Sequence, residues 1–133
     1  MRTRSAIAAS CALAAALLPA LAAGQGADIL SYQGPDREKR LIEQAKKEGT
    51  VSLYTSLAPT ESQPMAEAFE KKYGIKVELW RSQSERVVQR VVSEAKAGRN
   101  TVDVIATNGP EMESLAREKE LTTYFTPHAT DLP

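Results

Sequence analysis

Short apolar segments alternate along the chain with longer stretches in which apolar residues recur at helical spacing. The short segments predict β-strands and the longer stretches predict amphipathic α-helices, because the side-chain pattern repeats every two residues in a strand and every ~3.6 residues in a helix. Strand, turn and helix follow one another about every 25 residues. The predicted strands are Thr50–Thr55, Ile75–Trp80 and Val102–Ala106, and helices are predicted over residues 36–48, about 62–73, from the turn 81–85 to about 97, and about 110–120.

This recurrence is typical of βαβ units and therefore predicts an α/β fold, with a parallel sheet and helices on both faces. The second strand alternates, with Ile75, Val77 and Leu79 on one side, as expected at a sheet edge. The third strand is almost continuously apolar, as expected inside a sheet. The pattern therefore predicts strand order 2-1-3 with right-handed crossovers.

Small polar side chains gather where each predicted strand ends. The strand-to-helix turns of a parallel sheet all lie on one edge, and ligands bind where the strand order reverses. Each turn also leads into a helix N-terminus, which favours anions, and an arginine adds a planar fork suited to carboxylate or phosphate. The candidate ligand-binding residues are Thr55, Ser56, Arg81, Ser82, Ser84 and Asn108.

Helix capping is the alternative role for these side chains, because Ser, Thr and Asn hydroxyls and amides satisfy free N–H groups at helix starts. Thr60 with Gln63, and Ser82 with Glu85, have the spacing of a capping box. One such turn is better explained by capping. Three turns on one edge favour a ligand site.

Residues 1–23 are predicted to be a secretory signal peptide. Two arginines precede the apolar run Ile7–Leu21, and residues 20–22 have the small-x-small pattern of a cleavage site. The run is shorter than the roughly 18–20 residues that cross a bilayer. The alternatives are an uncleaved anchor and a lipoprotein, and the lipoprotein would need Cys11, which lies inside the apolar run.

Composition argues against several functional classes. Cleavage of the signal removes the only cysteine, which leaves no disulfide and no thiol nucleophile. The chain has 17 basic and 17 acidic residues without a basic stripe, so nucleic acid is not an expected partner. Hydrolase, phosphate-loop and metal-spaced motifs are missing, and the single histidine, His128, has no neighbour in sequence to activate. We therefore expect no catalytic residues, no metal ligands and no cofactor.

Three stretches together resemble the extracellular solute-binding proteins of bacterial ABC importers, in the branch labelled iron(III) or ferric substrate-binding. They are "LIEQAKKEGTVSLYTSL", "AFEKKYGIKVELWRSQSERVVQRVVSEAKAGR" and "VDVIATNGPEMESLAREKEL". The resemblance covers residues 36–127 and implies a two-lobed periplasmic protein that delivers its ligand to a permease in the inner membrane. It also implies that residues 24–133 are part of the N-terminal lobe, that the second lobe is absent, and that the protein is a monomer.

The resemblance places binding positions after strands 1, 2 and 3, at Ser56, at Arg81, Ser82 and Ser84, and at Asn108. Members that ligate iron directly often carry a histidine and an acidic residue where this chain has Ala58 and Asn108. The resemblance therefore implies a small anionic solute or an iron(III) complex as the cargo, with no iron ligand from this lobe. The alternative is a fragment of an exported α/β enzyme whose catalytic residues lie elsewhere. Trp80 is interpreted either as a stacking platform beside Arg81 or as a packing residue.

We expect the exported protein to begin within Ala23–Ala27, because cleavage is predicted near Ala22 or Ala23. N-terminal sequencing of the periplasmic fraction checks this, and a mature protein that begins at Met1 would contradict it.

Overall fold

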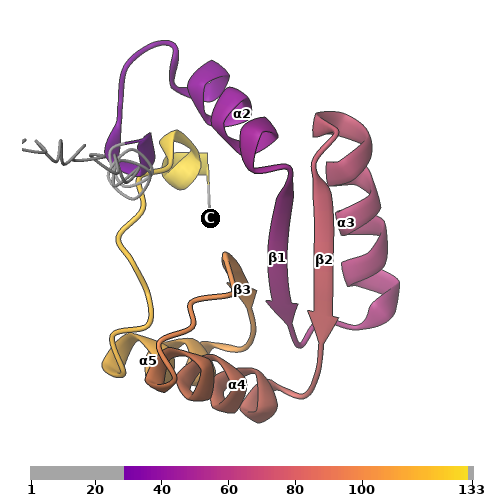
Figure 1. Ribbon diagram of the computed structural model, residues 1–133, viewed down its shortest axis with the longest axis vertical. Helices are drawn as coiled ribbons and strands as arrows, with labels where there is room; N and C mark the ends of the chain where they lie inside the picture. The colour runs from indigo at the N-terminus through magenta and orange to yellow at the C-terminus, as the bar shows by residue number, and fades with distance from the viewer. Residues whose placement is uncertain (1–28, 132–133) are drawn as a thin grey trace, which may run out of the picture.

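The structure, a computed structural model, describes residues 29–131, so the predicted signal peptide lies outside the described residues. Three parallel strands form one sheet in the order β2-β1-β3, which confirms the predicted α/β fold and strand order. In Figure 1 the strands β1 and β2 run side by side and point towards the end of the molecule where α4 and α5 lie. The elements are α2 (Arg37–Glu48), β1 (Thr50–Thr55), α3 (Pro59–Tyr73), β2 (Lys76–Arg81), α4 (Ser84–Lys96), β3 (Val104–Ala106), α5 (Gly109–Arg117) and the 3₁₀ helix η1 (Pro127–Asp131).

The central strand β1 is covered on both faces. Leu53, Tyr54 and Thr55 are all buried, and consecutive strand residues point to opposite faces of the sheet. Helix α3 packs against β2, and helices α2 and α4 pack against β1. Within the described sheet β3 lies at the edge, where Val104 is 48% exposed, so the third strand is not the inner strand that its sequence suggested.

Helix α3 begins earlier than predicted, and neither of the two predicted capping boxes forms. Helix α3 starts at Pro59, because proline presets the backbone angle of a first helical residue and loses no hydrogen bond there. Thr60 therefore lies inside the first turn, and the carboxylate that reaches back is that of Glu61, which accepts a hydrogen bond from the Ala58 N–H (3.3 Å). The N-cap of α4 is Gln83, so Ser82 does not cap that helix.

The start of α2 was predicted correctly, but the Asp36 side chain does not cap the helix as predicted. Asp36 occupies the N-cap position without a side-chain cap hydrogen bond. Its carboxylate instead accepts hydrogen bonds from the Tyr32 hydroxyl (2.5 Å) and from Arg40 Nε (2.7 Å). These contacts tie the segment before α2 to the first turns of the helix.

A cluster of buried residues joins the sheet to α4 and α5. Tyr54 of β1 packs with Val87 and Val91 of α4 and with Leu115 of α5. Val87 and Leu115 are fully buried, at 0% exposure. This cluster is small, so each side chain in it contributes a large share of the packing between the two helices and the sheet.

Arg37 connects the two ends of the described chain. Its residue exposure is only 8%, and its Nη2 donates hydrogen bonds to the carbonyl oxygens of Phe125 (2.6 Å) and Leu30 (3.4 Å). The guanidinium also lies over the rings of Tyr124 and Phe125, at 5.5 and 5.4 Å from their centres. Figure 1 shows the N-terminal and C-terminal segments side by side at this place. None of the helices in residues 29–131 is long and apolar enough to span a membrane.

We expect Leu115→Ala to lower the free energy of unfolding by about 2–5 kcal/mol, because it removes a fully buried side chain from the joint between α4, α5 and the sheet. The control is Met65→Ala on α3, where the side chain is 46% exposed and a change within about 0.5 kcal/mol is expected. Denaturant unfolding of both variants measures the difference, and equal stabilities would contradict the assignment of this core.

Candidate functional site

The three strand-to-helix turns meet at one edge of the sheet, as predicted. The Ser56 hydroxyl lies 3.1 Å from the Thr107 hydroxyl, and the Ser56 N–H donates to the Ala106 carbonyl (3.0 Å). The Asn108 side-chain amide donates to the Ser84 hydroxyl (2.8 Å). The third turn is therefore hydrogen-bonded to both of the others, and Ser56, Ser84 and Asn108 belong to one connected group.

Arg81 ends β2 on the same edge and is exposed. Its Nε donates to the Leu57 carbonyl (2.9 Å), which fixes the guanidinium against the turn after β1. This is the only hydrogen bond that the Arg81 side chain makes within the described residues, so the terminal nitrogens keep their donors for another partner. Ser82 is half-buried next to it, and its N–H donates to the Thr55 carbonyl (3.0 Å).

Thr55 differs from the other candidates because it is fully buried. Its hydroxyl accepts a hydrogen bond from the Leu57 N–H (3.1 Å), two residues further along the chain. A side chain with 0% exposure cannot reach a ligand in solvent. Thr55 therefore shapes the first turn, while Ser56 presents the hydroxyl at the surface of that turn.

The helix starts at this edge are not capped by serine or threonine side chains. Neither Gln83 at α4 nor Asn108 at α5 makes a side-chain cap hydrogen bond, so within the described residues the N–H groups in the first turns of both helices, Pro110 aside, remain for an anion. Glu85 and Glu111 lie in those first turns and offset part of the positive helix ends. At the start of α3 the Glu61 carboxylate already accepts a hydrogen bond from the N–H of the N-cap residue, Ala58.

A second polar group, which the turn pattern did not predict, lies between β1, α4 and the segment before β3. The Glu94 carboxylate accepts hydrogen bonds from the Tyr54 hydroxyl (3.0 Å), the Thr101 hydroxyl (2.5 Å) and Arg90 Nε (2.8 Å). Burial acts to raise the pKa of this carboxyl, but the hydrogen bonds from Thr101, Arg90 and Tyr54 outweigh it and hold the pKa below its ordinary value of 4.5. The spacing of Arg90 and Glu94, four residues apart on one helix, is the sequence signal that could have found part of this group.

Trp80 belongs to the same group and is not a platform for Arg81. Its ring lies 5.0 Å from the ring of Tyr54, and the Arg90 guanidinium lies 4.4 Å from the centres of both rings. The packing interpretation of Trp80 is therefore the correct one, with α4 as the adjacent helix.

Within the described residues, His, Cys, Asp and Glu form no group of three or more that could hold a metal ion. Ala58 and Asn108 are the N-caps of α3 and α5. His128 lies in η1, the 3₁₀ helix that follows residue Thr126.

The strand order and helices define an α/β fold with a parallel three-stranded sheet. A solved structure with this fold is iron-bound HitA from Pseudomonas aeruginosa, which matches with a TM-score of 0.54 and 24% sequence identity. The match covers 62% of this chain and 26% of HitA, so the chain spans about a quarter of the length of HitA. No protein family model and no curated protein matches the chain.

We expect stability to fall as the pH drops through the depressed pKa of Glu94. A carboxyl whose pKa is lower in the folded protein stabilises the fold above its unfolded pKa, and that contribution is lost on acidification through the folded pKa. Glu94→Gln should therefore be less stable than the wild type at pH 7, and the difference should shrink below about pH 4. Melting temperatures between pH 7 and pH 3 measure this, with Glu67→Gln on the exposed side of α3 as the control. A constant difference between Glu94→Gln and the wild type at all pH values would contradict the expectation.

Proposed function

We propose that the protein is the periplasmic solute-binding component of an ABC importer. In this proposal residues 1–23 are a cleaved signal peptide and residues 24–133 are part of the N-terminal lobe. The bound solute is passed to a permease in the inner membrane, and the protein acts as a monomer and as a binding protein rather than an enzyme. The likeness in fold to HitA supports this class of function.

One observation carries the proposal: three strand-to-helix turns from separate parts of the sequence are hydrogen-bonded into one polar edge. Hydrogen bonds between turns bring Ser56, Ser84 and Asn108 together before any ligand arrives, which lowers the entropy cost of binding. Arg81 adds a permanent positive charge whose terminal donors have no partner in the described part of the chain.

The chemistry of this edge favours an anionic solute. Its donors are the Arg81 guanidinium, the hydroxyls of Ser56, Ser82 and Ser84, and the free N–H groups of α4 and α5. A carboxylate or phosphate group matches these donors. Iron(III) would enter as the centre of an anionic complex, because Ala58 and Asn108 supply no anionic oxygen to the metal.

We expect Arg81→Ala to weaken binding of the anionic solute about ten- to a hundredfold, since a charge-assisted hydrogen bond contributes roughly 1.5–3 kcal/mol. Ser56→Ala removes one neutral hydrogen bond and should cost about 1 kcal/mol of binding free energy. Calorimetric titrations with inorganic phosphate, citrate and ferric citrate provide the measurement, with melting curves of each variant recorded in parallel.

The control is Lys47→Ala, which removes an exposed basic side chain from the last turn of α2, away from the strand-end turns. It should leave the affinity for the solute unchanged. If Arg81→Ala and Ser56→Ala bind as tightly as the wild type and Ser56→Ala only lowers the melting temperature, the turns are caps and the proposed site is wrong.

A further inference from the structure

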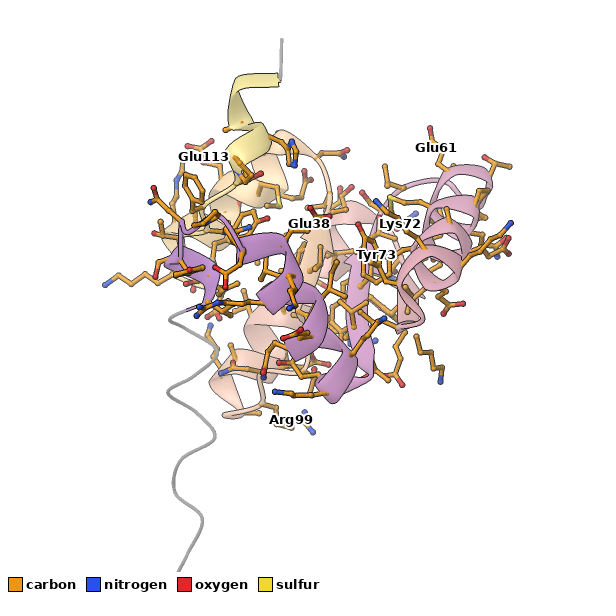
Figure 2. All side chains as sticks on the ribbon, turned by 90° about the horizontal axis from the view of Figure 1, so that it is seen from above. Glu38, Glu61, Lys72, Tyr73, Arg99 and Glu113 are labelled. Atoms are coloured by element: carbon orange, nitrogen blue, oxygen red, sulfur yellow. The ribbon has the colours of Figure 1, made fainter. Side chains whose placement is uncertain are left out.

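A hollow of ≈ 410 Å³ lies on the face of the sheet that α4 covers only in part. Its floor includes Tyr54 and Trp80, and its walls include Arg90, Glu94 and Arg99. The volume falls within the range of about 300–1,000 Å³ that is usual for small-molecule sites. In Figure 2 Arg99 lies far from Glu61, which marks the start of α3 and hence the strand-end edge.

The two arginines of this hollow keep most of their hydrogen-bond donors. Arg90 uses Nε to bind Glu94, and its terminal nitrogens have no partner among residues 29–131. Arg99 is exposed, and its side chain makes no hydrogen bond or ion pair within those residues. A guanidinium carries five N–H donors, so the pair offers up to nine after the one that Glu94 takes.

In contrast, the carboxylate oxygens that line the hollow already have partners. Both oxygens of Glu94 accept hydrogen bonds, one from Arg90 and the other from the Tyr54 and Thr101 hydroxyls. The second carboxylate of the lining, Glu78, lies 3.7 Å from the ammonium of Lys76 and is mostly exposed. Unpaired donors therefore exceed unpaired acceptors in this hollow, which suits an oxyanion.

We propose that this hollow is a second binding site, which takes a small molecule with a phosphate or carboxylate group between Arg90 and Arg99. Planar guanidinium groups bind both oxyanions through paired N–H donors. Arg90 is held in place by the rings of Tyr54 and Trp80 and by Glu94, so its outer donors are oriented before the anion arrives. The site uses none of the residues of the strand-end turns and does not depend on the proposed transport function.

Trp80 provides the signal for a test, because its ring lines the hollow and contacts Arg90. Titration of the protein with inorganic phosphate, and separately with benzoate, is followed by tryptophan fluorescence at constant ionic strength set with chloride. The Trp80→Phe variant identifies the part of the signal that comes from this residue. We expect a saturable change with at least one of the two anions.

Arg99→Gln should weaken that binding about tenfold or more, because it removes a charged donor group from an exposed position without disturbing the core. Glu78→Gln should strengthen binding, because it removes the carboxylate that opposes an anion. Arg86→Gln, on the exposed side of α4, should bind like the wild type. The absence of a saturable change, the same change with chloride alone, or equal affinity of Arg99→Gln and the wild type would overturn the proposal.

Discussion

The hydrogen bond from the Tyr54 hydroxyl to the Glu94 carboxylate joins the central strand β1 to helix α4. Tyr54 lies in the middle strand, with its ring among Val87, Val91 and Leu115 and its hydroxyl on the carboxylate of Glu94. The Glu94 carboxylate is partly buried and receives hydrogen bonds from three side chains, which offset the cost of its partial removal from water. Helix α4 is therefore fixed to β1 both by apolar packing and by a polar contact that permits only one rotation of the helix.

The orientation of α4 in turn determines the strand-end edge. Ser84 begins α4, and its hydroxyl accepts the hydrogen bond from Asn108 at the start of α5. A rotation or shift of α4 would break this contact and separate the second turn from the third. The polar edge thus depends on packing at Val87 and Val91, residues that would contact no ligand there.

Local patterns in the sequence predicted the elements and their order well. Alternation in Ile75–Trp80 correctly predicted a strand at the sheet edge, because burial on one face gives apolar residues a period of two. The apolar character of Val102–Ala106 predicted a strand there but not its exposure at the edge of the described sheet. Convergence of Ser56, Arg81 and Asn108 followed from topology alone, since parallel strands end on one edge.

Contacts between distant residues were not predictable in the same way. The hydrogen bond between Tyr54 and Glu94 joins positions 40 residues apart, and nothing in either local pattern indicates it. The start of α3 was also missed, because Pro59 at the first helical position outweighs the capping spacing of Thr60 and Gln63. Burial of Thr55 could not be seen either, since a threonine at a strand end has the same local sequence whether it faces solvent or the turn.

The contacts of Arg37 with Leu30 and Phe125 affect how the fold responds to mechanical force. Residues Leu30 and Phe125 meet there through one backbone hydrogen bond and one shared guanidinium, so the described chain enters and leaves the fold at the same point. A pull applied between Leu30 and Phe125 is resisted first by this backbone hydrogen bond and by the two hydrogen bonds from Arg37. Under such a pull, the hydrogen bonds of the polar edge come under load only after the contacts at Arg37 have broken.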